Sequence, residues 1–557
     1  MKTENNRYII GIDAGGTYTD AVLLEQPANR VLFTAKVPTT HHQLSLGIAR
    51  CLRQLFADSP VQPAEVGVVA VSTTLATNTV VEGKGAAVGL LIAGPAKHFR
   101  LPVVSTSFLR GGHNHLGEEE EKLDMEGLVD AVLRCKTHVD AYAVCAAMSI
   151  VNPAHEQIMA EAIRMIDPKP VFLSHEVSDR PGIKERAATS VFNVRLMPVM
   201  QDFLNGMQEA LASLGVAGKV YIIRGDARPM DIGNTLKQAA STVASGPAAT
   251  AWYGLSFAPA PEALIVDIGG TTTDITIIRE GRPIIDDQGS LIGEWLTHVD
   301  AVQMSTVGAG GDSHASVNRQ GVLSVGPGRV QPLAMAVQSP SPAQWIGKGL
   351  RDPCVMLEPN IEPEDAAQDK VLTYLAQHGP ATPEQLKEHF DMAEITLLTH
   401  LKELNRLQLI MEIGFTPTDA LHVLGLLSLG NRQAATEGAD RLAAELGITA
   451  EEFCRQVLAG VEQKIENAII DHILKIETGK SMTDFFSGQR RSNLLDIRFS
   501  ARAPIVGIGA AARYFLPGVA ARLATEVFFP DHYEVGNALG AALMAGTVPG
   551  ERNHDRG

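Results

Sequence analysis

The sequence predicts an α/β fold built around a duplicated domain, and two observations support this. The stretch DAGGTYTD at Asp13–Asp20 returns as DIGGTTTD at Asp267–Asp274, 254 positions later. Short apolar runs also alternate with helix-like stretches between and after the two copies. Two unrelated hairpins would not be expected to share Asp, Gly, Gly, Thr, Thr and Asp at matching positions, so we interpret the pair as a repeated domain.

Each copy is predicted to be a strand, a tight Gly-Gly turn and a second strand. The apolar runs elsewhere predict further strands, and the small-residue stretch Val535–Ala545 predicts a helix. The expected strands are Tyr8–Asp13, Tyr18–Leu24, Gly67–Val71, Ala87–Ala93, Ala141–Ile150, Pro170–Leu173, Val220–Ile223, Ala263–Asp267, Thr273–Ile278, Ala503–Ile508 and Glu526–Phe529.

Composition excludes several classes of function. The net charge of −16 argues against nucleic acid or an anionic membrane as the main partner. Five scattered cysteines without a CxxC pair favour unpaired thiols in a reducing compartment. The polar start of the chain has no apolar leader, and no run approaches the roughly 18 apolar residues expected of a spanning helix. We therefore expect a cytoplasmic protein.

Residues 362–413 look like an insertion of three helices and a short strand, similar to a winged-helix module. Gln368–Gln377 is the first helix, Thr382 and Pro383 open the second, and Asp391 is expected to cap the third. The stretch from Glu362 to Glu412 holds ten acidic and four basic residues. Because a DNA-reading helix needs cations for phosphate, we favour a structural or protein-docking module over a nucleic-acid reader.

The repeated loops have the chemistry of a phosphate site. Glycines let backbone N–H groups approach an anion, and threonine hydroxyls donate to phosphate oxygens. A carboxylate at the end of the first strand, Asp13 or Asp267, can hold hydrated Mg²⁺. We expect ATP and Mg²⁺ as cofactors, with Asp20 and Asp274 bracing the loops. The predicted phosphate-binding residues are Gly15, Gly16, Thr17, Thr19, Gly269, Gly270, Thr271 and Thr272.

A third glycine-rich turn follows the strand at Ala503–Ile508. Gly507, Gly509 and Ala510 stand between this strand and a helical stretch, where small residues would let adenosine lie against the backbone. Two such loops and this turn resemble the actin-like ATPases, whose nucleotide lies between two duplicated ribonuclease-H-like domains. The resemblance implies that fold here, with the helical segment as an insertion.

The chain also resembles one family in particular, the ATP-binding subunits of the hydantoinase/oxoprolinase enzymes. The resemblance covers nearly the whole chain. It rests on Gly11–Asp20, Ser72–Leu91, Ser174–Asp179, Lys184–Asn193, Ala244–Ala249, Val266–Ile275, Val307–Ala315, Gly414–Gly425 and Val506–Ala512.

The resemblance implies an ATP-dependent hydrolase that activates a cyclic amide or imide by phosphorylating its carbonyl oxygen, with ring opening in a second subunit. It implies a small-molecule substrate, a hydantoinase-type partner and an oligomer. The implied domains are 1–200, the N-terminal actin-like domain; 201–361, the first part of the second actin-like domain; 362–413, the insertion; and 414–550, the remainder.

Further site residues follow from these motifs. Thr73, Thr74 and Asn78 form a polar cluster after a strand, suited to a substrate carbonyl or a phosphoryl group; the alternative is a capped helix start. Gly308 and Gly310 are expected near the nucleotide. Where relatives show an Asp-x-His pair, this chain has Gln303 and Ser305. Asp312 and His314 are then either a shifted metal site or loop residues.

A different class of function also fits the sequence. An ATP-driven conformational switch or activator of a protein partner would account for the insertion and for the altered GAGGDS segment, Gly308–Ser313.

Overall fold

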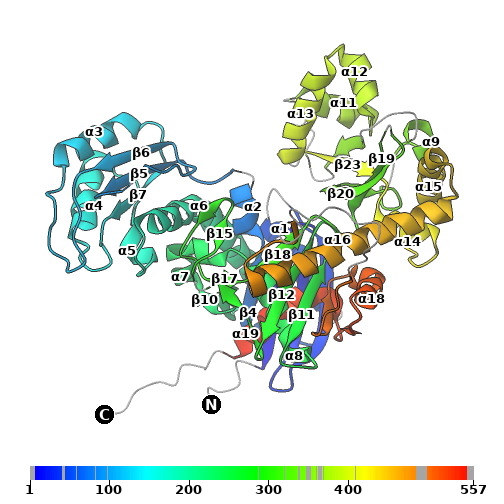
Figure 1. Ribbon diagram of the computed structural model, residues 1–557, viewed down its shortest axis with the longest axis horizontal. Coiled ribbons are helices and arrows are strands. Elements are labelled where there is room, and N and C mark those ends of the chain that lie inside the picture. Colours follow the sequence, from blue (N-terminus) through cyan, green and yellow to red (C-terminus); the bar gives the residue numbers. More distant parts are fainter. Residues whose placement is uncertain are drawn as a thin grey trace. The chain divides into compact units, whose positions relative to one another are not determined.

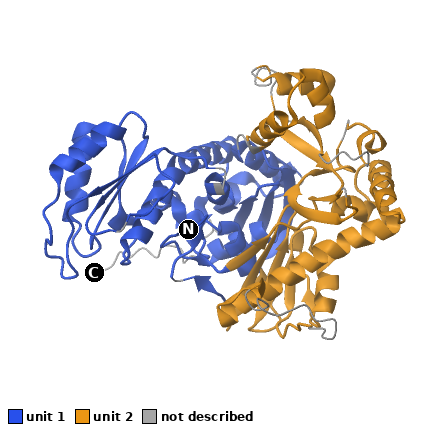
Figure 2. Ribbon diagram, turned by 45° about the horizontal axis from the view of Figure 1, so that its top comes forward, with its two compact units in different colours: residues 1–253, 283–303, 535–557 blue, residues 254–282, 304–534 orange. Residues whose placement is uncertain are grey.

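The computed structural model describes residues 7–40, 44–57, 59–81, 83–96, 98–286, 288–318, 320–336, 339–346, 353–358, 361, 367, 369–407, 409–483 and 498–547. The chain folds into two compact units (Figure 2). Unit 1 comprises residues 1–253, 283–303 and 535–557, and unit 2 comprises residues 254–282 and 304–534. The predicted boundary at residue 200 falls inside one continuous helix, α6 (Ile183–Ser213).

The first sheet of unit 1 has the strand order β10-β9-β4-β1-β2-β3. Figure 1 labels β4 and β10 of this sheet. Strand β1 pairs antiparallel with β2 and parallel with β4, and β4 pairs parallel with β9. Apolar residues of this sheet pack against α1 and α6, as Ile12, Leu52 and Leu204 illustrate. The bounds are β1 (Tyr8–Ala14), β2 (Tyr18–Glu25), β3 (Arg30–Pro38), β4 (Val66–Thr73), β9 (Lys219–Ile223), β10 (Pro229–Asp231) and α1 (Leu44–Ala57).

The helix α19 (Gly536–Gly546) returns to this sheet from the end of the chain. It lies so close to β1 that a Cβ on Gly11 would stand 1.9 Å from the carbonyl oxygen of Ala538. Small residues on both elements permit this approach. The predicted small-residue helix is therefore confirmed, and it joins the C-terminal segment to the N-terminal strand.

A second sheet in unit 1 has the order β6-β5-β7-β8 and is wholly parallel. Alternate residues of β5 enter opposite cores: Leu91 packs with α3 and α4, whereas Leu90 packs with α6. This alternation is the period of a strand covered on both faces. The bounds are β5 (Val88–Ala93), β6 (Ser105–Leu109), β7 (Ala141–Ala146), β8 (Val171–Leu173), α3 (Met125–Cys135), α4 (Ala154–Ile166) and α5 (Ser174–Val177).

The rest of unit 1 consists of short elements. Segment 283–303 forms two small ladders, β14 with β17 and β15 with β16. The helix α8 carries the chain from unit 1 into unit 2. The bounds are η1 (Pro63–Glu65), α2 (Leu75–Val81), α7 (Ile232–Lys237), η2 (Ala239–Thr242), α8 (Ser245–Phe257), β14 (Ile285–Asp286), β15 (Leu291–Ile292), β16 (Trp295–Leu296) and β17 (Ala301–Val302).

Unit 2 repeats the hairpin plan of unit 1. In the order β13-β12-β11-β24-β25, β11 pairs antiparallel with β12 and parallel with β24, and β18 pairs with β12. The bounds are β11 (Ala263–Ile268), β12 (Thr273–Arg279), β13 (Arg282–Pro283), β18 (Met304–Val307), β19 (Ser313–Val317), β20 (Leu323–Arg329), β24 (Ile505–Ile508), β25 (Val527–Phe528), α14 (Pro417–Val423), α15 (Arg432–Leu446), α16 (Ala450–Thr478), α18 (Ala512–Arg522) and η3 (Tyr533–Val535).

The predicted insertion forms three helices followed by a strand, α11 (Lys370–His378), α12 (Pro383–Phe390), α13 (Glu394–Arg406) and β23 (Ile410–Gly414). Its core includes Leu372, Leu386 and Leu401. Strand β23 pairs with β21 (Gln331–Pro332) and β22 (Cys354–Leu357), and α9 spans Pro342–Trp345. Residues 362–366, 368 and 408 lie outside the described residues, so the predicted start of the first helix at Gln368 is not described.

One prediction for this segment is wrong. Thr382 caps α12 with a capping box, as expected, but Asp391 does not cap the third helix. Asp391 adopts a left-handed conformation with φ of 49° and ends α12, while Ala393 precedes α13. An aspartate tolerates this conformation better than most residues, so it serves here as a C-terminal stop.

Two predictions from composition can be checked. All five cysteines are buried and unpaired. Within the described ranges, no helix has the length and apolar character needed to cross a bilayer.

Candidate functional site

The two predicted loops form the same turn in their respective units. In unit 1 the N–H of Gly15 donates to the carbonyl oxygen of Tyr18 at 3.1 Å. In unit 2 the N–H of Gly269 donates to the carbonyl oxygen of Thr272 at 3.0 Å. The strand registers also match, with Asp13 opposite Asp20 and Asp267 opposite Asp274. Gly16, Thr17, Gly270, Thr271 and Thr272 are partly exposed in these turns.

Asp13 lies at the end of β1 and is 5% exposed. The hydroxyl of Ser72 donates to its Oδ1 at 2.6 Å, and the amide of Asn537 donates to its Oδ2 at 3.5 Å. These donors come from β4 and from the start of α19. They orient the carboxylate, which suits a group that holds a hydrated cation.

The predicted cluster after β4 divides into two roles. The hydroxyl of Thr73 is buried and accepts from the N–H of Leu75 at 3.0 Å, so it binds the backbone where α2 begins. Asn78 instead donates to Thr74 Oγ1 at 3.2 Å, and its amide lies 3.8 Å from the position of a Cβ on Gly16. Thr74 and Asn78 are therefore beside the first loop and partly exposed.

Thr19 and Asp20 brace the first loop from behind. Thr19 is fully buried, and its hydroxyl lies 3.2 Å from that of Thr39. The hydroxyl of Thr39 in turn donates to the carbonyl oxygen of Gly15 at 2.8 Å. Asp20 pairs with Lys36 at 2.9 Å. Thr19 thus does not face the open side of the turn where phosphate contact was predicted, because the side chains of a strand alternate between faces.

In unit 2 the GAGGDS segment packs directly on the second loop. The N–H groups of Gly311 and Asp312 donate to the carbonyl oxygens of Gly269 and Gly270, at 3.2 and 2.7 Å. A Cβ on Gly310 would lie 2.6 Å from both of those oxygens. Glycine is therefore required at 310 for this close approach.

The turn after β24 joins the same loop. Gly509 has a φ of 87°. A Cβ added to it would lie 2.5 Å from Oδ1 of Asp267 and 2.4 Å from the carbonyl oxygen of Ile268. Ala510 next to it is exposed. The GAGGDS segment and this turn therefore both contact the second loop. That they contact a nucleotide stays a prediction.

Two of the predicted nucleotide glycines lie in tightly packed positions. A Cβ on Gly507 would stand 2.6 Å from the ring of Phe529, and one on Gly308 would stand 2.7 Å from Pro327. Gly507 is buried in β24. Both positions need a glycine for space, and their predicted contact with a nucleotide stays a prediction.

Asp274 stands opposite Asp267 and accepts a hydrogen bond from the hydroxyl of Thr306 at 2.7 Å. Burial and the neighbouring charge of Asp267 raise the pKa of Asp274 to about 7. The two carboxyls thus belong to one electrostatic unit.

Asp312 and His314 face different neighbours. Asp312 Oδ2 lies 2.5 Å from the position of a Cβ on Gly270, with Arg329 at 3.6 Å, and burial raises its pKa. His314 lies in β19 against Gly414, and burial lowers its pKa to about 4. Within the described ranges, no group of three or more His, Cys, Asp and Glu residues could hold a metal ion. The structure therefore gives no support to a joint metal site at these two residues.

A buried network at the SHEVSD motif, Ser174–Asp179, was not assigned a role from sequence. Glu156, on α4, is fully buried and accepts hydrogen bonds from the hydroxyl of Ser174 at 2.5 Å and from the N–H of Ala146 at 2.8 Å. Its carboxylate also lies 2.6 Å from Nδ1 of His175, and this hydrogen bond raises the pKa of His175. Arg186 is buried beside it and donates to Ser174 at 3.2 Å. This network joins β7, α5 and α6, which explains the motif as a structural feature.

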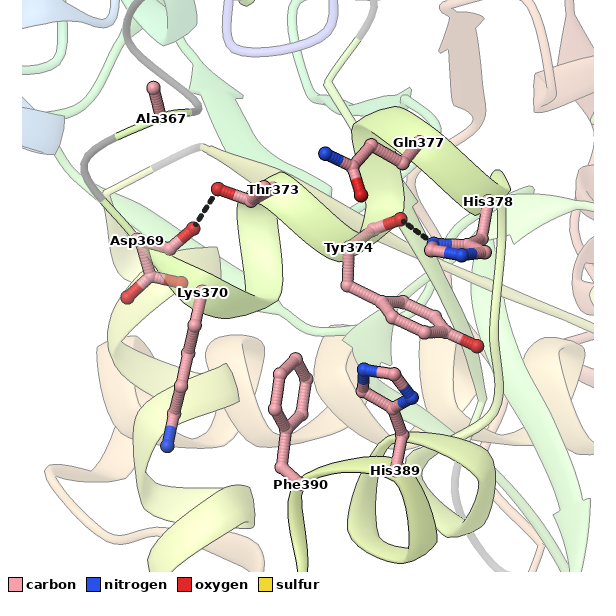
Figure 3. A pocket seen from close by; sticks show the side chains of 9 residues that line it. All are labelled: Ala367, Asp369, Lys370, Thr373, Tyr374, Gln377, His378, His389 and Phe390. Atoms are coloured by element: carbon pink, nitrogen blue, oxygen red, sulfur yellow. Dashed lines mark hydrogen bonds between the residues drawn. The ribbon is translucent and has the colours of Figure 1, made fainter.

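A pocket of about 430 Å³ lies in the helical segment between α11 and α12 (Figure 3). The ring of Tyr374 stacks on His378 and lies close to His389, and Lys370 lies over Phe390. The pocket shares no residue with the predicted phosphate loops, so it is a separate feature of the molecule.

Comparison with family models gives two matches along the chain. Residues 9–167 match the hydantoinase/oxoprolinase N-terminal region, and residues 186–545 match the hydantoinase/oxoprolinase model. A curated relative, the caprolactamase subunit alpha of Pseudomonas jessenii, is 30% identical over 386 residues, 63% of this chain and 53% of that protein. The acetophenone carboxylase gamma subunit of Aromatoleum aromaticum is 28% identical over 375 residues, 57% of this chain and 49% of that protein. The chain thus spans about half the length of these relatives.

Solved structures show the same fold. Nucleotide-free acetone carboxylase gives a TM-score of 0.65 at 17% identity, covering 96% of this chain and 70% of that chain. The ATP-dependent caprolactamase of Pseudomonas jessenii gives 0.62 at 22% identity, with the same two coverages. The predicted α/β class and the predicted family resemblance are confirmed.

Proposed function

Since this chain belongs to the hydantoinase/oxoprolinase family, we propose that it uses ATP to activate a cyclic amide or imide together with a second subunit. The observation that carries the proposal is the matched pair of Asp-Gly-Gly-Thr turns. Each turn combines a strand-end carboxylate with partly exposed glycines and threonines. Such turns present backbone N–H groups and hydroxyls to phosphate.

The residues present fit ATP and Mg²⁺. Gly15, Gly16 and Thr17 in unit 1 would contact phosphate oxygens, as would Gly269, Gly270, Thr271 and Thr272 in unit 2. Asp13 or Asp267 would hold Mg²⁺ through water, and the ion would neutralise phosphate charge. Asp13 is already fixed by Ser72 and Asn537. Ala510, exposed beside Gly509, would border the adenosine.

The reaction follows from the chemistry of an amide. The carbonyl oxygen of a lactam or imide attacks the γ-phosphorus of ATP, the bond from that phosphorus to the bridging oxygen breaks, and ADP leaves. Water then adds to the activated carbon, and the ring C–N bond breaks as the nitrogen takes up a proton, which leaves an acyl phosphate. A second water hydrolyses the acyl phosphate to a carboxylate and phosphate. Thr74 and Asn78, beside the first loop, are suited to orient the reacting oxygen.

The experiment is a screen of ATP hydrolysis by the purified chain, alone and with its co-expressed partner. The substrates are 2-pyrrolidone, ε-caprolactam, hydantoin, 5-oxoproline and acetone. Stimulation by a cyclic amide, abolished in Asp13→Asn, is the expected result. Hydrolysis that ignores every small molecule and rises only with a protein partner would contradict the proposal and favour an ATP-driven switch.

A further inference from the structure

An arginine is held beside the second Asp-Gly-Gly-Thr loop by two backbone hydrogen bonds. The N–H of Asp312 donates to the carbonyl oxygen of Gly270 at 2.7 Å, and the N–H of Val330 donates to the carbonyl oxygen of Asp312 at 3.0 Å. Next to Val330, Arg329 on β20 stands opposite Ser313 on β19. The GAGGDS segment therefore ties the end of β20 to the loop and fixes the backbone from which Arg329 extends.

The side chain of Arg329 is held loosely. Its Nε lies 3.6 Å from Oδ2 of Asp312, whereas a charge-assisted hydrogen bond is usually about 2.7 to 2.9 Å long. Among the described residues this is its only ion pair, and its side chain is 35% exposed. A guanidinium has five N–H groups, so this contact leaves the fork of its two terminal nitrogens available to another partner.

Three carboxylates lie around the same loop. Asp267 and Asp274 face each other in its hairpin, and Oδ2 of Asp312 lies 2.5 Å from the position of a Cβ on Gly270. A polyphosphate brought to this loop would meet these negative charges, and their repulsion would oppose its binding. A cation beside the loop offsets that repulsion, and a planar guanidinium can bind two phosphate oxygens at once.

We propose that Arg329 binds the phosphates of ATP at the second loop, and that it exchanges Asp312 for phosphate oxygens when the nucleotide enters. The exchange loses little, because the contact with Asp312 is long and partly exposed. Asp312 serves as the resting partner that keeps the guanidinium beside the loop. The proposal rests on the proposed function, since it takes ATP as the ligand there, and it adds a phosphate-binding residue outside the glycine-rich turns.

The nucleotide affinity of the full-length chain, measured by titration calorimetry with Mg²⁺, tests this contact. We expect Arg329→Gln to weaken ADP binding about tenfold or more, the ratio that a hydrogen bond to a charged group supplies. Adenosine binding, followed by saturation-transfer difference NMR, should be unchanged because adenosine has no phosphate. Arg329→Lys keeps the charge and loses the planar fork, so it should restore part of the ADP affinity.

A double variant separates contact with phosphate from simple charge neutralisation. If Arg329 only offsets the charge of Asp312, Arg329→Gln has no effect once Asp312→Asn has removed that charge. If Arg329 binds phosphate, Arg329→Gln weakens ADP binding about tenfold in the Asp312→Asn background as well. Unchanged ADP affinity in that background would overturn the proposal, and so would an equal loss of affinity for adenosine and ADP.

Arg279→Gln is the matched control. Arg279 is 41% exposed and pairs with Glu477, so the variant also removes one positive charge and one ion pair from unit 2. Arg279 ends β12, which leaves the loop at Thr273, about 20 Å away along the strand. This distance exceeds the Debye length of about 8 Å at physiological ionic strength, so ADP affinity should stay within about twofold of wild type. A loss as large as that of Arg329→Gln would show that net charge governs binding and would overturn the contact.

The outcomes also separate this proposal from the proposed function. If ADP binding depends on Arg329 while no cyclic amide stimulates ATP hydrolysis, the phosphate contact stands and the proposed substrate is wrong. If cyclic amides stimulate hydrolysis while the Arg329 variants keep wild-type ADP affinity, the contact is wrong and the function stands. If the wild-type chain binds neither ATP nor ADP, both are overturned.

Discussion

Gly509 and Asp267 approach so closely that a Cβ on Gly509 would lie 2.5 Å from Oδ1 of the aspartate. This contact joins the turn after β24 to the second Asp-Gly-Gly-Thr loop. The carboxylate position thus depends on a residue 242 positions later in the sequence.

We predict that Gly509→Ala lowers ADP affinity about tenfold or more, because the methyl group displaces either Asp267 or the loop carbonyl of Ile268. Gly447→Ala is the matched control: Gly447 has a φ of 67°, and a Cβ at this position would meet nothing within 4 Å. The control shares the backbone strain of about 1 kcal/mol and lacks the collision. Equal ADP affinities in the two variants, measured by calorimetry, would show that the contact is unimportant.

Asp13 and Asp20 are opposite each other in one hairpin, yet their environments predict different phenotypes. Asp13→Asn should abolish ATP hydrolysis at a nearly unchanged melting temperature, because the amide retains the volume and loses the charge offered to a cation. Asp20→Asn breaks the pair with Lys36 and should lower the melting temperature while hydrolysis persists. The check is a steady-state hydrolysis assay beside thermal unfolding, and the reverse pattern would exchange the two roles.

Much of this structure is readable locally from the sequence, and the remainder depends on tertiary contacts. The paired loops and the Thr382 cap follow from short-range chemistry. The prediction for Asp391 was wrong because an aspartate can either begin or end a helix. Its left-handed φ of 49° shows that it ends α12. The N–H of His298 donates to the hydroxyl of Thr189 on α6 at 2.8 Å, and these residues are 109 positions apart. No periodicity signals such a meeting, because it is fixed by how segment 283–303 packs on α6.

The buried network around Glu156 predicts a large effect on stability. Glu156→Gln removes the buried carboxylate that accepts from Ser174 and pairs with His175, so the network loses its negative charge. We expect a loss of about 3 kcal/mol or more in the free energy of unfolding. Glu161→Gln, an exposed position on the same helix, should change it by less than about 0.5 kcal/mol. Similar urea midpoints for the two variants would contradict the structural role given to this motif.

His472, on α16, predicts a pH dependence of stability. Burial lowers its pKa to about 4, and its Nε2 is buried without a partner among the described residues. An unfolded histidine titrates near 6.5, so between about pH 6.5 and 4 the unfolded chain takes up a proton that the folded chain excludes. Stability is therefore lost as pH falls through that window. His472→Leu should flatten this acid limb in melting experiments, whereas His138→Leu, at an exposed position, should retain it.

Asp312 distinguishes two interpretations of the GAGGDS segment. Its carboxylate lies beside Gly270 in the proposed phosphate cradle, with Arg329 at 3.6 Å. If it holds no cation, its charge opposes a polyphosphate. Asp312→Asn should then tighten ADP binding about threefold to tenfold at low ionic strength, with a smaller gain at high salt, because screening weakens the repulsion. Released from its ion pair, Arg329 would add to the gain. If Asp312 is instead a metal ligand, the same variant weakens ADP binding only when Mg²⁺ is present. Titrations of ADP with and without Mg²⁺ therefore decide between the two, and because no group of metal-ligating residues gathers at Asp312 in the described structure, we expect the tightening.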